Sequence, residues 1–258
     1  MKIAVLGAGV FGSALAGVLS EKSYAVALYD PILKNKLSDC LEGAEMMILA
    51  APSAALPELL PKLPKELPLI IATKGVLNEA VFADFKDYMV LSGPGYATDI
   101  VDHKKTLLTA TDQRIIDIFT TDYLTFEYTN DVRGVLMCGA LKNTYAILAG
   151  FLNLKIGELS WKEFINEVVD EMRELLDVNG ANSSTVDLAC GRKDLEITCK
   201  EPSRNYDFGQ KLRENPEYLP QNTAEGITAL KRVKNGAIIV PENAVKLRFL
   251  MENSDKWA

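Results

Sequence analysis

The chain has 258 residues, a formal charge of −7 and 48% hydrophobic against 24% charged residues. This length fits one large or two modest domains, and the composition is typical of a globular, enzyme-sized protein. The acidic balance and the absence of a basic run argue against nucleic acid and anionic membranes as partners.

Cysteine and histidine usage narrows the chemistry further. The four cysteines, Cys40, Cys138, Cys190 and Cys199, have no CxxC spacing and lie among apolar or small residues. This pattern predicts structural thiols in a reduced, cytoplasmic protein. No signal peptide is expected, because the chain passes directly from its first residues into a strand. No apolar run approaches the ~20 residues of a membrane span. The single histidine, His103, lies in a charged segment, so we expect a loop residue, no metal site, and acid–base chemistry by lysine or carboxylate.

The N-terminal segment has the pattern of a dinucleotide-binding βαβ unit. A strand at Lys2–Leu6 leads into a glycine-rich turn, a helix at Ser13–Leu19, and a second strand at Ala25–Tyr29 that ends at Asp30. Isolated glycine patterns are common, but here both strands, the helix and the acid are in place. We therefore predict a Rossmann-type domain.

The glycines of the turn have distinct predicted roles. Gly7 would permit the tight turn, Gly9 would let a pyrophosphate approach the backbone, and Gly12 would let the helix pack on the strand. The helix N-terminus would face the phosphates. Asp30 would accept the ribose 2′-hydroxyl, so NAD is predicted as cofactor, with NADP the disfavoured alternative because a carboxylate repels a 2′-phosphate.

Further strands alternate with helical or loop segments, which predicts a parallel, doubly wound sheet. They are expected at Met46–Ala50, Leu69–Ala72, Tyr88–Leu91, Thr106–Thr109 and Phe126–Tyr128. Ligands bind such sheets beyond the carboxyl ends of the strands, where Lys74 stands. Only a short stretch follows Asp30 before the next segment, so the sheet is expected to be trimmed after its second strand.

The second half has helical rather than strand patterns. Helices are predicted at Asp131–Gly150, Trp161–Leu176, Asn222–Val233 and Glu242–Met251. We therefore predict a dinucleotide-binding domain over residues 1–130 and an all-α domain over residues 131–258 that holds substrate.

The helix Asp131–Gly150 is apolar almost all the way round, which predicts a buried helix. Lys142 and Asn143 stand in its middle, and Gly139 leaves space one turn before the lysine. A buried lysine is costly unless it has partners or a task. The alternative is a lysine whose stem runs along the core to the surface.

A polar cluster follows in residues 191–212. Asp194 and Thr198 are four residues apart, so they would share a helix face. Ser203 would start another helix, with Arg204 and Asn205 in its first turn, which is a typical phosphate site. A surface helix cap with an exposed arginine is the alternative. Glu225 near the next helix would be a functional acid or merely a first-turn carboxylate stabilised by the helix dipole.

These motifs together resemble the NAD(P)-dependent glycerol-3-phosphate dehydrogenase family. The matching pieces are GAGVFGSALA, APS, TKG, SGPGYA, GALKNTYAILAG, KDLEITC with SRNYDFG, and AEGITA. The resemblance implies a Rossmann domain followed by a helical domain, and interconversion of sn-glycerol 3-phosphate and dihydroxyacetone phosphate. The implied partner is a small phosphorylated polyol or ketone, and a homodimer is left open as the assembly state.

The resemblance also implies roles for particular residues. Lys142 would be the proton acceptor, Lys74 a second cation at the reacting centre, and Asp194 and Thr198 supports for the carbinol. Substrate contacts are implied for Lys74, Gly93, Asn143, Asp194, Ser203, Arg204 and Asn205. Cofactor contacts are implied for the three turn glycines, Val10, Phe11, Asp30, Pro52, Lys74, Ala97, Arg204 and Glu225.

The chain also departs from the family pattern. Gly95 stands where the family usually has serine, and the segment after Asp30 is short. Two alternatives therefore remain open. One is a ketopantoate- or β-hydroxyacid-type reductase, which would act on carboxylates. The other is a non-catalytic NAD-binding sensor.

Overall fold

The computed structural model describes residues 1–218 and 225–254, and the chain divides into two compact units. Residues 1–73 and 79–132 form the first unit. The second contains everything from Arg133 onward together with the short segment Lys74–Asn78. The segment that follows the fourth strand therefore packs with the helical unit, although its sequence lies within the nucleotide-binding half.

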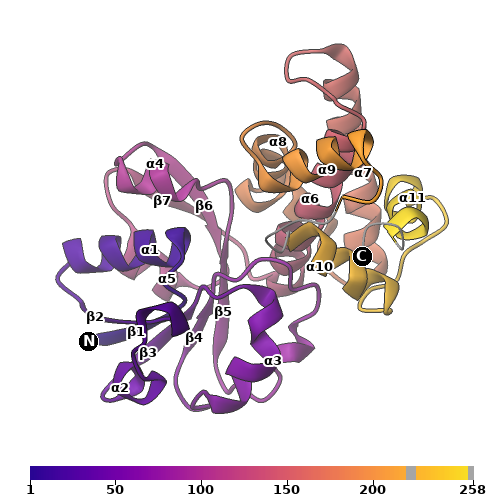
Figure 1. The fold of residues 1–258 in the computed structure, drawn as a ribbon. Coiled ribbons are helices and arrows are strands. Elements are labelled where there is room, and N and C mark those ends of the chain that lie inside the picture. The colour runs from indigo at the N-terminus through magenta and orange to yellow at the C-terminus, as the bar shows by residue number, and fades with distance from the viewer. Residues whose placement is uncertain (219–224, 255–258) are drawn as a thin grey trace. The chain divides into compact units, whose positions relative to one another are not determined.

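The first unit is built on a seven-stranded sheet with the order β2-β1-β3-β4-β5-β6-β7 (Figure 1). The strands are β1 (Lys2–Leu6), β2 (Ala25–Tyr29), β3 (Met46–Leu49), β4 (Leu69–Ile71), β5 (Tyr88–Ser92), β6 (Thr106–Ala110) and β7 (Leu124–Tyr128). The seven predicted strands are confirmed, with ends shifted by at most two residues. Their pairing is parallel except at one position.

That exception corrects the expectation of a wholly parallel sheet. β5 and β6 pair antiparallel, with Leu91 opposite Ala110 and Ser92 opposite Thr109. Residues alternate between the two faces of a strand in either direction, so the sequence pattern predicts which side chains are buried but not which way the strand runs. The Rossmann-type fold class is nevertheless confirmed.

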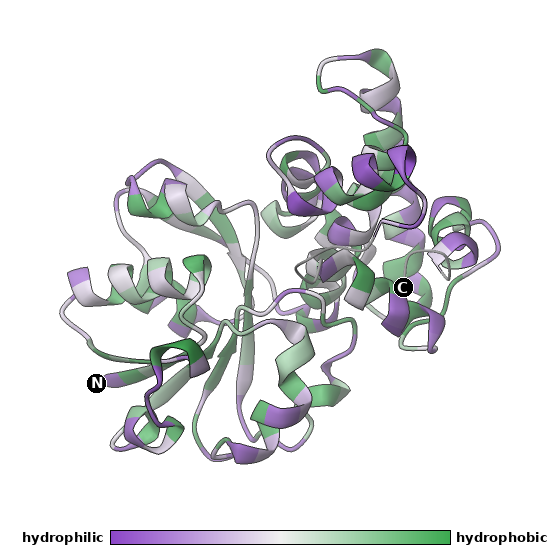
Figure 2. Cartoon of the chain, viewed as in Figure 1, coloured by the Kyte–Doolittle hydropathy of each residue, from purple (hydrophilic) through white to green (hydrophobic). Residues whose placement is uncertain are grey.

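Helices cover both faces of the sheet, which is why the central strands β3 and β4 are apolar and buried along their whole length (Figure 2). On one face, Ile3, Val5 and Ile48 pack against α1 (Val10–Glu21), α4 (Ala97–Val101) and α5 (Gln113–Phe119) in a single core. The short helices α2 (Leu37–Leu41) and α3 (Leu56–Leu59) lie on the other side.

The sheet is trimmed after its second strand, as expected. β2 leads into a single 3₁₀ turn, Pro31–Leu33, and the five-residue α2, after which the chain returns to pair β3 with β1. In the six-stranded Rossmann order a further strand lies outside β2. In the part of this chain that the structure describes, β2 is instead the edge strand, and its residues are only partly buried.

The second unit is helical. Its helices are α6 (Val132–Phe151), α7 (Leu159–Val178), α8 (Asp194–Thr198), α9 (Arg204–Glu214), α10 (Glu225–Lys234) and α11 (Val245–Asn253). The four long predicted helices are confirmed, although the first three residues of the predicted Asn222–Val233 helix lie outside the described residues.

Helix α6 is the core of this unit, buried from Gly134 to Gly150. It approaches α9 so closely that a methyl group at Gly150 would lie 1.9 Å from the Tyr206 carbonyl oxygen, and one at Gly209 would lie 2.0 Å from that of Ile147. Glycine is therefore required on both helices. By length and composition α6 could cross a membrane, but 94% of its apolar window is buried inside the protein.

Candidate active site

Lys142 lies at the centre of the second unit. Its side chain is 2% exposed and pairs with the carboxylate of Asp194 on α8, which is fully buried. The Lys142 ammonium therefore does not reach the surface, which excludes the alternative of a core lysine that extends its charged end into solvent. Apart from this ion pair, neither Asp194 oxygen has a hydrogen-bond partner among the described groups. A buried carboxylate with unused acceptor positions is costly, which marks it as a candidate functional group.

Local backbone geometry aims Asp194 at the lysine. The π-helical segment Ala189–Lys193 before it is kinked at Gly191, where a methyl group would lie 2.0 Å from the Val186 carbonyl oxygen. The Thr198 hydroxyl donates to the Asp194 carbonyl oxygen at 2.6 Å, so both lie on one helical turn, as the spacing predicts.

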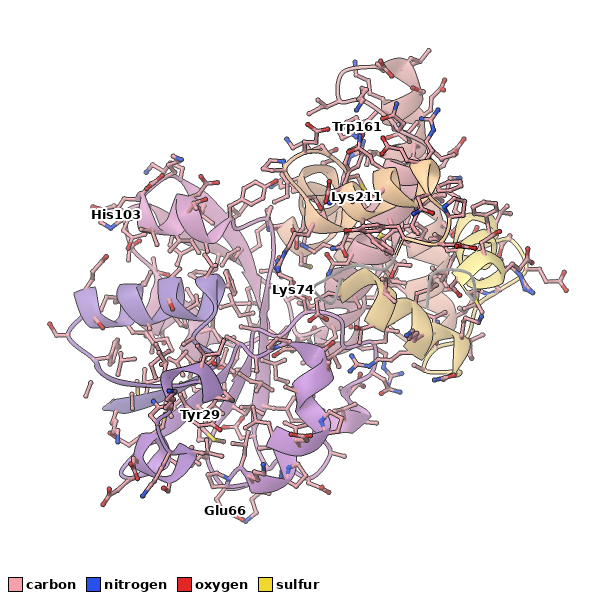
Figure 3. The ribbon with its side chains drawn as sticks, in the orientation of Figure 1. Tyr29, Glu66, Lys74, His103, Trp161 and Lys211 are labelled. Carbon is pink, nitrogen blue, oxygen red and sulfur yellow. The ribbon has the colours of Figure 1, made fainter. Side chains whose placement is uncertain are left out.

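The end of α8 is fixed from a neighbouring helix. Trp161 on α7, labelled in Figure 3, donates from its indole nitrogen to the Cys199 carbonyl oxygen at 2.9 Å. This bond occupies a terminal carbonyl of a short helix that would otherwise lack a partner. Burial raises the pKa of the Cys199 thiol, which lies close enough to Lys142 for the ammonium to oppose that shift. Cys199 therefore stays a protonated thiol and has a structural role beside Lys142.

The electrostatic environment lowers the pKa of Lys142 to about 7. Burial is the largest cause, because it penalises the charged form. Asp194 opposes the shift, and the neighbouring Lys74 ammonium adds to it by repulsion. A lysine balanced in this way can exchange a proton near neutral pH.

A relay of amides joins three helices beside Lys142. Asn143 donates to the Gly139 carbonyl oxygen at 3.1 Å, and its own side-chain oxygen accepts from Asn205 on α9 at 3.0 Å. The Asn205 oxygen in turn accepts from the backbone of Gly226 on α10 at 3.1 Å. Both asparagines are buried. They therefore fix the first turns of α9 and α10 against the helix that carries Lys142.

The remaining candidates of this unit lie at helix starts. Ser203 caps α9, as predicted, by accepting from the Tyr206 N–H at 3.4 Å. Arg204 follows it and is exposed, whereas Glu225, in the first turn of α10, is half-buried. Arg204 and Glu225 each lie in the first turn of a helix. This position is compatible with a binding role and equally with a purely structural role at the helix start.

In the first unit, the glycine turn has the geometry that the motif predicts. Gly7 has a φ of 114°, in the region that favours glycine, and a methyl group at Gly12 would lie 2.0 Å from the Gly7 carbonyl oxygen. Gly9, by contrast, faces open space and caps α1 without a side-chain hydrogen bond. The backbone N–H groups at the start of α1 are therefore accessible to an anion.

Asp30 braces this turn. One carboxylate oxygen accepts from the Ala8 N–H at 2.9 Å, and the other from the Ile32 N–H at 3.0 Å. The acid at the end of β2 is thus held beside the glycine turn, as expected, and also caps the 3₁₀ turn that follows.

The other candidates of the first unit have varied exposure. Val10 and Pro52 are exposed, and Phe11 and Ala97 pack partly on the core. Gly93 is buried with a φ of 144° and has no room for a side chain against β6. His103 is an exposed loop residue stacked on Tyr123, with its Nε2 3.1 Å from a Glu21 oxygen (Figure 3).

One residue of the second unit, Arg232, was not predicted from the sequence as part of the site. Arg232 on α10 donates to the Gly75 carbonyl oxygen at 2.5 Å, next to Lys74. Only its position two helical turns after Glu225 could have drawn attention to it. Among the described residues no group of histidine, cysteine, aspartate or glutamate side chains is arranged to hold a metal ion.

Comparison with known proteins gives one consistent result. Residues 131–248 match the family model of the NAD-dependent glycerol-3-phosphate dehydrogenase C-terminus. A glycerol-3-phosphate dehydrogenase [NAD(P)+] of Leptospira biflexa is 30% identical over 91% of this chain and 87% of its own length. The solved glycerol-3-phosphate dehydrogenase of Coxiella burnetii is 26% identical with a TM-score of 0.84, covering 99% of this chain and 96% of that one.

A reductase of the alternative type is also similar, but less so. A ketopantoate reductase from Ralstonia eutropha has a TM-score of 0.54 and 16% identity, with 99% of both chains covered. This likeness shows a shared fold alone.

Proposed function

The chain belongs to the family of NAD(P)-dependent glycerol-3-phosphate dehydrogenases, and we propose that Lys142 is the residue that exchanges the proton in its reaction. The activity is hydride transfer between a nicotinamide cofactor and the pair sn-glycerol 3-phosphate and dihydroxyacetone phosphate. The observation that carries the lysine proposal is the buried pair of Lys142 with Asp194, beside Lys74.

In the oxidation direction the carbinol must lose a proton from oxygen and a hydride from carbon. Neutral Lys142 accepts the proton, and a nicotinamide cofactor, when bound, would supply the acceptor for the hydride. In reduction the Lys142 ammonium returns the proton to the oxygen of the ketone as it becomes an alcohol. Asp194 orients the ammonium and keeps the pKa of Lys142 from falling further, because its charge favours the protonated lysine.

Negative charge develops on the substrate oxygen in both oxidation and reduction. Cations beside that oxygen stabilise the charge. Lys74 supplies such a cation. Thr198 holds the turn that carries Asp194 and offers its oxygen to the substrate hydroxyl. We assign the phosphate and the remaining hydroxyl to Gly93, Asn143, Ser203, Arg204 and Asn205.

The cofactor would be held mainly by the glycine turn. The open approach at Gly9 and the accessible N–H groups of α1 fit a pyrophosphate, and the residues around it fit the adjoining parts of a dinucleotide. They are Gly7, Val10, Phe11, Gly12, Asp30, Pro52, Lys74, Ala97, Arg204 and Glu225. The family uses NAD or NADP. We propose NAD for this chain because the Asp30 carboxylate would repel a 2′-phosphate.

We propose that residues 1–130 bind the dinucleotide and that residues 131–258 hold the substrate. Lys74–Asn78 belong by packing to the helical unit, and so bring a second cation to Lys142. All four cysteines lie among the described residues, where they are buried and form no disulfide. Thiols of this kind fit a reducing compartment, so we propose that the protein works in the cytoplasm. A homodimer is the assembly that we would test first.

The direct test is to mix purified protein with NADH and dihydroxyacetone phosphate and follow NADH oxidation. Lys142→Ala should lower turnover by orders of magnitude while circular dichroism stays native. Near-normal turnover by that variant would refute the lysine assignment. A parallel panel of ketopantoate and β-ketoacids separates the alternative reductase. Tight NADH binding without turnover on any substrate would favour the sensor.

A further inference from the structure

Arg232 is a polar residue of the second unit to which the proposed chemistry gives no role. It lies on α10 and is half-buried, and its guanidinium donates to the Gly75 carbonyl oxygen at 2.5 Å. The two residues are 157 positions apart in sequence. A charged side chain drawn into the protein to bind one backbone carbonyl needs a reason, because desolvating it is costly.

The acceptor of this bond belongs to the Lys74 turn, the segment Lys74–Asn78. Gly75 has a φ of 84°, so the backbone reverses there in a conformation that favours glycine. The segment is short and has no helix or strand structure. The two residues that follow Gly75, Val76 and Leu77, are buried. The Arg232 bond therefore fixes the backbone directly next to Lys74.

Glu225 influences Arg232 electrostatically. Burial lowers the pKa of the Arg232 guanidinium from its usual value, and the charge of Glu225 opposes that shift. Glu225 stands two turns earlier on α10, so both side chains lie on the same face of the helix. Glu225 thus compensates part of the charge that Arg232 carries into the protein.

We propose that Arg232 is a positioning residue, which clamps the Lys74 turn to α10 and thereby holds the Lys74 ammonium beside Lys142. This inference rests on the proposed function only in giving Lys74 its task. In this proposal Arg232 acts through Lys74 and is assigned no contact with substrate or cofactor. Loss of the clamp should reproduce part of the loss of Lys74 itself.

A double-mutant cycle tests this link. Arg232→Met keeps the aliphatic stem and removes the donor, and should lower kcat/KM for dihydroxyacetone phosphate by about tenfold, the effect expected of one charge-assisted hydrogen bond. Added to Lys74→Met it should cost less than about twofold more, because coupled residues do not contribute independently. Losses that multiply in full would overturn the proposal.

Two further variants guard against a general structural effect. Lys231→Met, at an exposed neighbour on the same helix, should leave kcat/KM unchanged. Arg232→Lys, which restores a donor, should recover activity to within a few-fold of wild type. An Arg232→Lys protein no better than Arg232→Met would count against the clamp. If Arg232→Met fails to fold, Arg232→Leu, which also removes the donor, replaces it in the cycle with Lys74→Met.

A readout independent of turnover separates this inference from the proposed function. In protein with ¹³C-labelled lysine, Lys142 should titrate at higher pH in Lys74→Met, because the repulsion from Lys74 is gone. Arg232→Met should shift the titration in the same direction. A shift in Lys74→Met alone would overturn the clamp. A wild type that turns over no polyol phosphate but shows both shifts would refute the function and leave the clamp standing.

Discussion

The two units carry their chemistry on different parts of the chain. In the first, the candidate groups are backbone N–H groups at an accessible turn, where Gly7 and Gly12 have no room for a side chain and Gly9 leaves open space for a ligand. In the second, they are charged side chains with almost no exposure, held by an ion pair and an amide relay. The first site should therefore be sensitive to added volume, and the second to removed charge.

The largest expected effect comes from removing the buried charge. Lys142→Met should lower kcat by about 10²- to 10⁴-fold, the usual contribution of a general acid–base group. It should also lower the free energy of unfolding by about 3–5 kcal/mol, because Asp194 is left buried and unpaired. Steady-state kinetics and urea unfolding measure the two effects.

A second substitution and a surface pair provide the controls. Lys142→Met combined with Asp194→Leu should regain stability but not activity, since no buried charge remains. Lys155→Met breaks an exposed pair with Glu201 and should change stability by less than about 1 kcal/mol. Equal costs for the buried and the exposed pair would contradict the contrast between the units.

The next effect tests added volume in the first unit. Gly9→Ala meets no atom within 4 Å, so the fold should stay intact while NADH binding weakens by about ten- to a hundredfold, through crowding of the pyrophosphate. Gly12→Ala clashes with the Gly7 carbonyl oxygen and should instead lower the unfolding free energy by about 1–3 kcal/mol. Fluorescence titration with NADH and thermal unfolding distinguish them. Identical behaviour of the two variants would refute separate roles.

A third prediction concerns pH. Burial lowers the pKa of Lys142 to about 7, so its neutral, proton-accepting form grows as pH rises through that value. In glycerol 3-phosphate oxidation kcat/KM should rise about tenfold per pH unit below that pKa and level off above it. Reduction needs the ammonium and should show the opposite slope. Profiles that are flat between pH 6 and 8 in both directions would exclude Lys142 as the titrating group.

The smallest expected effect is on cofactor choice. Asp30→Asn removes the charge but keeps an oxygen that can accept from Ala8, so the preference for NADH over NADPH should fall only a few-fold. Asp30→Ala also removes that brace and should weaken both cofactors. Measurement of kcat/KM with NADH and NADPH tests this. A wild type that prefers NADPH would overturn the argument from Asp30.

The sequence was most informative where local physics decides the outcome. Strand positions, the glycine turn and the buried character of α6 follow from side-chain period and steric demands, so the structure differs from prediction there mainly at element ends. The sequence could not give the direction of β6, because alternation is the same for parallel and antiparallel strands.

In the candidate site, too, local patterns predicted some features and tertiary packing decided the others. Lys142 and Asn143 stand out because polar residues in an apolar helix conflict with its burial, and Asp194 and Thr198 share a helix turn by spacing. Their meeting depends on tertiary packing: Lys142 and Asp194 are 52 positions apart and form an ion pair after the chain bends at Gly191.

The sequence by itself determined the fold class, the glycine turn and the position of Lys142 in a buried helix, since each follows from short-range patterns. Only the tertiary structure decided that Lys74 packs with the helical unit, that the Asp194 carboxylate has no partner other than Lys142 among the described residues, and that Arg232 reaches Gly75. Contacts between distant segments depend on how helices pack, and a single chain has no local signal for that.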